Sequence, residues 1–354
     1  MENKKIRVGI THGDTNGVGY EIILKAFDDP TMLELCTPII YGSPKVATYH
    51  CNVMGLQTQF SILSRTEGIR DDRVNLLAVI DDEIKVDMGH KTPESTEAAR
   101  IVMKQALSDY EAGVFDVLVC GPEDSAENEQ EGLTLLMAEN LNVAFVTNKL
   151  AIKDVAEAIT KPIIVDKAKT LHQALKRDLR ISNPRIAVLA LNPTGGTHEE
   201  EDEIIVPAID ELAQQGIQAF GPYQADEFFG TGAYLRFDAV LAMYYDQGMA
   251  PFKAIAADEG IKFMAGLPIV KTATMHDAQY DIAGKGVADP TQLRHAIWQA
   301  IDIWRNRVNY DKPLAHPLPK LYHEKRDDSE KVRFAIPKGK EQPKKEDKRP
   351  SEES

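Results

Sequence analysis

The feature that most constrains the fold is a repeated order in which a short apolar run ends in Gly, Pro, Asn or Asp and a helical pattern follows. Continuous β-branched and apolar runs of this length suit strands that are buried on both faces of a sheet. Amphipathic stretches with apolar residues at helical spacing lie between them. The runs are residues 7–10, 38–41, 74–80, 115–120, 143–147, 185–191 and 238–244, and the amphipathic stretches are residues 95–112, 170–179, 203–215 and 291–308. This alternation predicts an α/β architecture with a largely parallel sheet.

Composition divides the chain into a long globular part and a short charged tail. Its 354 residues are enough for one large α/β unit or for two domains that share a cleft. Residues 324–354 contain one aromatic side chain, Phe334, and more than half of them are charged. Such a segment cannot bury enough apolar surface to offset the entropy lost on ordering. We therefore expect an α/β unit over residues 1–323 and a disordered tail over residues 324–354; a binding role for the tail is the alternative.

The charge and cysteine content exclude several classes of partner. The net charge is −14, and residues 1–323 alone carry −15, because the tail has ten basic and nine acidic side chains. A body this acidic repels nucleic-acid phosphates and anionic membranes over long range. The three cysteines are too few for a disulfide framework, and no apolar run suits a signal peptide or a membrane span. We expect a cytoplasmic protein with reduced thiols and no nucleic-acid or membrane partner.

The first candidate site is the glycine-rich stretch after the first apolar run. Three glycines, Gly13, Gly17 and Gly19, allow positive φ and close backbone approach, and the helix that follows offers its N-terminal amides to an anion. The spacing does not match the dinucleotide fingerprint. A tight turn in which Asp14 satisfies loop amides is at least as good an interpretation.

Later strand ends carry a second set of polar residues. In open α/β sheets ligands bind at the carboxyl ends of strands. Asp246 and Lys253 follow the run at 238–244, and Lys271 stands in the segment that leads to His276. We expect Asp246, Lys253 and Lys271 near one rim of the sheet, where a general base and contacts to phosphate or carboxylate would be useful. For any single one of them, a solvated surface charge is the simpler interpretation.

Several motifs in one order resemble a known family, the PdxA group of 4-hydroxythreonine-4-phosphate dehydrogenases. The stretch from Gly13-Asp14 to Gly17-Val18-Gly19 with Glu21 looks like the family's Gly-Asp-Pro-Ala-Gly-Ile-Gly-Pro-Glu. Further matches are Leu191-Asn192-Pro193, Leu241-Ala242-Met243-Tyr244 with Asp246-Gln247-Gly248, Gly266-Leu267-Pro268 and Ala283-Gly284-Lys285-Gly286. Together the matches extend from about residue 8 to residue 308.

This resemblance implies a three-layer α/β/α fold like that of isocitrate and isopropylmalate dehydrogenases, with two domains around a cleft. It implies homodimers in which the second subunit completes each active site. It also implies oxidation of a phosphorylated hydroxy acid by NAD or NADP, followed by decarboxylation, in pyridoxal phosphate biosynthesis. A divalent metal held by three histidines polarises the reacting oxygen in the family, and the family's substrate lysine matches Lys253.

The sequence departs from the family at the metal ligands. The three histidines of the family correspond to Lys149, Thr194 and Tyr245 here, and none of these is a usual replacement for imidazole on zinc. The resemblance therefore predicts a site without the metal. His198 could be a relocated ligand, but an acidic helix start at residues 199–202 explains that stretch more simply. His276 could contact substrate, whereas His90 is expected to be structural.

The substrate positions depart as well. The family's substrate motif after Gly121-Pro122 is replaced by an acidic stretch, residues 123–132. A substrate-contacting Asn falls at Lys262 and an Arg at Lys271, which lacks the bidentate fork of Arg.

Two hypotheses follow. The first is a diverged NAD(P)-dependent dehydrogenase in which Asp246 and Lys149 are catalytic and Lys253, Lys271 and His276 bind substrate, with the Lys149 cation stabilising the developing oxyanion. The second is a catalytically inactive paralogue that acts as a binding or scaffold protein and dimerises with an intact relative.

Overall fold

A computed structural model of the chain describes residues 5–55, 60–80, 84–122, 132–194, 199–256 and 258–315. The described residues up to Leu314 belong to one compact unit. The predicted tail, His198 and all but the last residue of the acidic stretch at 123–132 lie outside the described residues.

Within the described residues, the strands form a single twelve-stranded sheet with the order β3-β4-β2-β1-β5-β12-β11-β6-β7-β10-β8-β9. The strands are β1 (Ile6–Thr11), β2 (Cys36–Gly42), β3 (Phe60–Leu63), β4 (Val74–Ala78), β5 (Val117–Cys120), β6 (Leu133–Ala138), β7 (Leu141–Phe145), β8 (Arg185–Leu189), β9 (Gln218–Tyr223), β10 (Ala239–Ala242), β11 (Ile261–Ala265) and β12 (Val270–Thr274). The helices are α1 (Gly19–Ala26), α2 (Thr31–Leu35), α3 (Pro44–Met54), α4 (Pro93–Glu111), α5 (Ile152–Ala158), α6 (Lys161–Arg177), α7 (Val206–Gln214), α8 (Ala225–Gly230), α9 (Tyr245–Ala256) and α10 (Thr291–Ala315).

The sheet consists of two parallel halves that run in opposite directions. β5 and β12 are parallel to β1, and β10 is parallel to both β7 and β8. Between the halves, β12–β11, β11–β6 and β6–β7 are three successive antiparallel pairs. The carboxyl ends of β1, β5 and β12 therefore lie at one edge of the sheet, and those of β7, β8 and β10 lie at the other.

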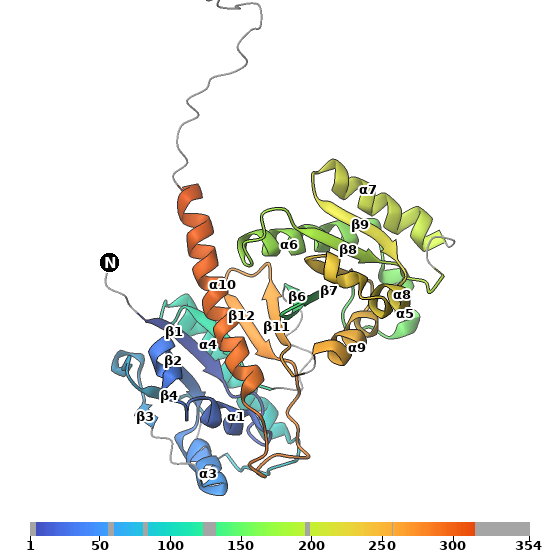
Figure 1. The fold of residues 1–354 in the computed structure, drawn as a ribbon. Helices are drawn as coiled ribbons and strands as arrows, with labels where there is room; N and C mark the ends of the chain where they lie inside the picture. The colour runs from blue at the N-terminus through green and yellow to red at the C-terminus, as the bar shows by residue number, and fades with distance from the viewer. Residues whose placement is uncertain are drawn as a thin grey trace, which may run out of the picture. The chain divides into compact units, whose positions relative to one another are not determined.

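Helices cover both faces of the sheet and make three layers. On one face, α1, α6, α7 and α10 pack against side chains such as Val119 and Leu241 in one continuous core. Figure 1 shows α10 lying across this face near β1 and β12, and the Thr272 hydroxyl in β12 donates a hydrogen bond to the Ala296 carbonyl of α10 (2.9 Å). On the opposite face, α4 packs against the sheet in one core, and α8 and α9 pack against it in a second core. The predicted three-layer α/β fold is confirmed.

A polar strip separates the two cores on that second face. Lys262 in β11 lies directly opposite Ala273 in β12 and Leu136 in β6. Ala273 packs against the α4 core, and Leu136 belongs to the α8–α9 core. Lys271 is two residues from Ala273 and therefore shares this face. Both lysines are half-buried, so the two cores meet at a strip that carries cations.

Candidate functional site

The glycine-rich stretch after β1 is a tight turn tied to three other parts of the chain. A Cβ on Gly13, where φ is +74°, would lie 1.9 Å from the Pro122 carbonyl oxygen. The Asp14 carboxylate accepts hydrogen bonds from the Asn16 backbone N–H (2.8 Å), the Ser95 hydroxyl (2.8 Å) and the Tyr280 hydroxyl (2.9 Å). The geometry therefore favours the tight turn over an open anion site.

A second glycine motif, which includes Gly286, is held against α1. Glu21 is fully buried, and its Oε1 accepts hydrogen bonds from Lys25 Nζ and from the Ala288 backbone N–H, each at 2.8 Å. Lys25 Nζ also donates to the carbonyls of Gly286 and Ala288, each at 2.8 Å. The two glycine motifs that the sequence places far apart are thus neighbours, and α1 positions the segment that follows β12.

The positions of the three missing histidines follow the carboxyl ends of β7, β10 and β8, which are neighbouring strands. We call this region the Lys149 edge; it contains Lys149, Thr194, Tyr245 and Asp246. The pairing of β7 with β10 continues past the strands, since the Val146 and Thr147 backbone N–H groups donate to the Ala242 and Met243 carbonyls (2.8 and 3.1 Å). Lys149 Nζ lies 5.9 Å from the centroid of the Tyr245 ring.

Two sets of hydrogen bonds fix the backbone at this edge. Gln247 accepts a hydrogen bond from the Met243 N–H (2.8 Å) and donates one to the Ala190 carbonyl (2.6 Å), which joins the ends of β10 and β8. Glu201 is buried and accepts from the backbone N–H groups of Leu191 (2.9 Å) and Asn192 (2.8 Å). The side chain of Gln247, from one family motif, and the Glu201 carboxylate therefore hold the backbone of both family motifs.

The residues of the Lys149 edge do not fit a divalent metal ion. An ammonium repels a dication, and neither a threonine nor a tyrosine hydroxyl replaces a neutral imidazole as a usual ligand. Across the described ranges, no three His, Cys, Asp or Glu side chains are grouped closely enough to hold a metal.

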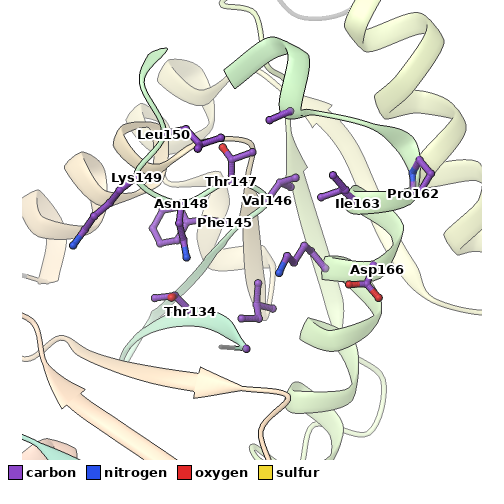
Figure 2. Close-up of a pocket in the computed structure, with 14 residues that line it drawn as sticks. Thr134, Phe145, Val146, Thr147, Asn148, Lys149, Leu150, Pro162, Ile163 and Asp166 are labelled. Carbon is purple, nitrogen blue, oxygen red and sulfur yellow. The ribbon is translucent and has the colours of Figure 1, made fainter. Parts of the chain in front are cut away.

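A hollow of about 790 Å³ opens beside the Lys149 edge. It lies between the start of β6, the end of β7 and helices α5 and α6. Its lining is mostly apolar and includes Phe145, Val146, Leu150 and Ile163. The side chain of Lys149 extends away from Val146 and Ile163, as Figure 2 shows. The ammonium therefore lies at the rim of the hollow and away from its apolar wall.

A second hollow, of about 410 Å³, lies at the opposite edge and brings Lys253 and His276 together. We call it the His276 pocket. Lys253 comes from the end of α9, and His276 follows β12. The other residues that line it are Asp258, Met275, Gln279, Ile282, Val287, Ala288, Asp289 and Gln292. Burial lowers the pKa of His276, and the nearby Lys262 cation lowers it further, while Asp277 and Asp289 partly oppose this. The imidazole is therefore neutral at pH 7.

The expectation that Asp246, Lys253 and Lys271 share one rim is wrong for Lys253. Asp246 stands at the start of α9, beside the carboxyl end of β10, whereas Lys253 lies two turns later in the His276 pocket. Lys271 is near the amino end of β12, and five residues of strand, roughly 16 Å, separate it from His276. The candidate residues thus form two groups at opposite edges of one sheet.

Comparison with known proteins agrees with the order of motifs. The sequence model described as pyridoxal phosphate biosynthetic protein PdxA matches residues 124–300. A protein of Bacteroides thetaiotaomicron named 4-hydroxythreonine-4-phosphate dehydrogenase is 45% identical over 358 residues, which covers 94% of this chain and 98% of that protein. The chain belongs to the PdxA family. No helix in the described ranges is long and apolar enough to cross a membrane.

Solved PdxA structures share the fold. The chain matches a 4-hydroxythreonine-4-phosphate dehydrogenase from Burkholderia phymatum with a TM-score of 0.67 and 26% identity, over 85% of this chain and 99% of that one. It matches the enzyme of that name from Klebsiella pneumoniae with a TM-score of 0.72 and 21% identity, over 86% and 99%. The latter likeness concerns the fold alone.

Sequence reasoning missed part of the His276 pocket. Asp258, Gln279, Asp289 and Gln292 were not singled out, although they line the same hollow as His276. The only local signal was that three of them follow the strand that leads to His276.

Proposed function

We propose that this PdxA-family chain is an NAD(P)-dependent dehydrogenase that oxidises a phosphorylated hydroxy acid and releases carbon dioxide, within pyridoxal phosphate biosynthesis. The observation that carries the proposal is the 45% identity, over nearly the whole chain, to a relative named 4-hydroxythreonine-4-phosphate dehydrogenase. The shared hollow of Lys253 and His276 supports it, because a substrate-binding lysine was expected at Lys253.

Cations at both edges suit an anionic substrate. Lys253 supplies one charge in the His276 pocket, and Lys262 and Lys271 supply two more on the polar strip. A lysine ammonium binds phosphate or carboxylate as a point charge, without the planar fork of arginine. Substrate specificity therefore depends on the spacing of these charges.

Asp246 and Lys149 have the catalytic roles in this proposal. A bound nicotinamide would supply the oxidising power by taking a hydride from the substrate carbon. As the carbonyl forms, the Asp246 carboxylate takes the hydroxyl proton. When the carboxylate leaves as carbon dioxide, its bonding electrons move to the carbonyl oxygen, and the Lys149 ammonium stabilises the negative charge there.

We propose that the His276 pocket holds the nicotinamide end of the dinucleotide, next to the substrate that Lys253 binds. The pocket lies at the carboxyl end of β12, where ligands bind in α/β sheets. Two carboxylates, Asp258 and Asp289, line it with one lysine, Lys253, and a neutral imidazole. A carboxylate accepts hydrogen bonds from ribose hydroxyls.

We also propose a homodimer in which each active site combines the Lys149 edge of one subunit with the His276 pocket of the other. The separation of the two groups on one chain supports this arrangement. Leu150, Ile152 and Ile163 are 47%, 66% and 38% exposed beside the Lys149 edge, and a partner would cover them. Mixing a Lys149→Met variant with a Lys253→Met variant should raise activity well above the low residual rate of either variant alone, through sites built from intact halves.

A cytoplasmic location and a separate tail complete the proposal. Cys36 and Cys51 are buried free thiols, which suits a reducing compartment. Residues 324–354 are proposed to remain outside the α/β unit of residues 1–323.

The test is turnover of 4-hydroxythreonine-4-phosphate by the purified full chain with NAD and with NADP, each with and without EDTA. Reduction of NAD that survives EDTA is the expected result. An absence of turnover under all conditions, with no thermal shift by nucleotide or substrate, would contradict it and favour the catalytically inactive paralogue.

A further inference from the structure

We propose that Tyr245 is a positioning residue that holds the ammonium of Lys149 over its ring, so that the two departures from the family act as one unit. This inference depends on the proposed role of Lys149. It assigns a chemical role to the tyrosine that replaces the third missing histidine, and it explains why a tyrosine at this position accompanies the lysine that replaces the first.

The strand pairing forces the two residues together. β7 and β10 are parallel neighbours in register, with Ala242 opposite Phe145. The Thr147 hydroxyl donates to the Met243 carbonyl (2.8 Å), so the chains stay paired until just before the two residues. Lys149 lies in the segment that follows β7, and Tyr245 is the first residue of α9. The Lys149 Nζ is therefore 5.9 Å from the ring centroid.

The Tyr245 ring packs against a buried aromatic side chain. It packs against the Phe145 ring with centroids 5.4 Å apart and planes at 30°. Phe145 is only 2% exposed and belongs to the core under α9. The hydrogen bonds of Gln247 with the Met243 N–H and the Ala190 carbonyl hold the first turn of the helix. The packing on Phe145 and the hydrogen bonds of Gln247 therefore hold the Tyr245 ring in place beside the lysine.

The aromatic ring of Tyr245 restricts the positions that the Lys149 ammonium can occupy. The four-carbon stem of lysine is flexible, and an exposed ammonium samples many positions. The negative face of an aromatic ring within about 6 Å attracts a cation. The ring thus holds the ammonium at the end of β7, where the reacting oxygen gains negative charge, and it reduces the ordering needed in the transition state.

The experiment is a double-mutant cycle on the full-length enzyme with 4-hydroxythreonine-4-phosphate and NAD. Tyr245→Leu should lower kcat about two- to fivefold, as expected for an exposed cation–π contact, with little change in KM. Tyr245→Phe keeps the ring and should rescue most of the loss. In a Lys149→Met background, Leu and Phe at position 245 should give equal rates. Equal kcat values for Tyr245→Leu and the parent enzyme would overturn the proposal. So would an equally large loss of kcat when Tyr245→Leu is made in the Lys149→Met background.

A second measurement separates this inference from the proposed function. In protein with ¹³C-labelled lysine, the ε-methylene protons of Lys149 should show an upfield ring-current shift that Tyr245→Leu abolishes and Tyr245→Phe preserves. If the shift is absent from the parent protein, the pair does not form and the proposal fails. If the shift behaves as expected while the protein turns over no substrate, the contact stands, and both the proposed function and the positioning role fail.

Discussion

The carboxylate of Asp14 accepts a hydrogen bond from the hydroxyl of Tyr280 at 2.9 Å, and this contact joins the glycine-rich turn after β1 to the segment after β12. Ser95 at the start of α4 donates to the same carboxylate oxygen at 2.8 Å. A turn that resembled an anion site therefore uses its acidic side chain to position the chain beside the His276 pocket.

Tyr280→Phe should loosen that segment. A hydrogen bond to a carboxylate contributes roughly 1.5–3 kcal/mol, so urea unfolding should show a loss within that range. Because the segment carries Gln279 and Ile282 of the His276 pocket, the KM for NAD should rise about threefold for a loss of roughly 0.7 kcal/mol of binding. Tyr49→Phe, at a side chain that is 45% exposed, is the control. Unchanged stability would show that the contact contributes nothing.

Two ion pairs join α6 to α10, and only one should matter for stability. Arg307 and Asp178 are 7% and 3% exposed, and two guanidinium nitrogens donate to the carboxylate at 2.7 and 3.2 Å. Asp178→Asn leaves a buried cation unpaired and should lower the free energy of unfolding by about 3–5 kcal/mol.

Arg177 and Asp311 provide the matched pair at the surface, with side chains 30% and 48% exposed. Asp311→Asn should cost less than about 1 kcal/mol, because solvent screens the exposed pair. Urea titration of both variants measures the difference. Similar losses for the two would contradict the argument from burial.

Stability should fall in mild acid because of His12. Burial lowers its pKa from 6.5 to about 3, and the ring stacks on Tyr20 with centroids 4.7 Å apart. Between these values the unfolded chain binds a proton that the folded chain does not. The free energy of unfolding is therefore unaffected by His12 above pH 6.5, where the imidazole is neutral in both states. As pH falls from 6.5 toward 3, it decreases by roughly 1.4 kcal/mol per pH unit.

His12→Phe keeps a ring in the stack and removes the titration. Between pH 7.5 and pH 5, the parent protein should lose about 2 kcal/mol more than the variant. Urea unfolding at the two pH values measures this. His50, whose pKa burial also lowers, remains in both proteins, so any residual slope is shared. Equal slopes would mean that His12 titrates normally.

Restoring the three histidines should create a metal site. Lys149→His, Thr194→His and Tyr245→His together place imidazoles at the ends of three neighbouring strands, and three histidines are a sufficient protein ligand set for zinc. The triple variant should retain about one zinc ion per chain after dialysis, as measured by elemental analysis. Tyr245→His alone is the control and should retain none. Failure of the triple variant to bind zinc would show that these positions do not converge.

Continuous apolar runs predicted the buried parallel strands well. The predicted runs at 115–120 and 143–147 contain β5 (Val117–Cys120) and most of β7 (Leu141–Phe145). β11 and β12 were not recognised, because Lys262 and Lys271 interrupt their apolar pattern. These lysines face the polar strip between two cores, so the local signal was that of half-exposed strands.

The sequence by itself determined the α/β class, the PdxA family and the replacement of three histidines, because these depend on residue types and on their order along the chain. Only the tertiary structure decided that Lys149 lies beside Tyr245 and that Lys253 joins His276 at the opposite edge. The physical reason is the antiparallel insertion of β11 and β6, which reverses the direction of the strands between β12 and β7. Strand direction depends on pairing between distant segments, and no local pattern of side chains encodes it.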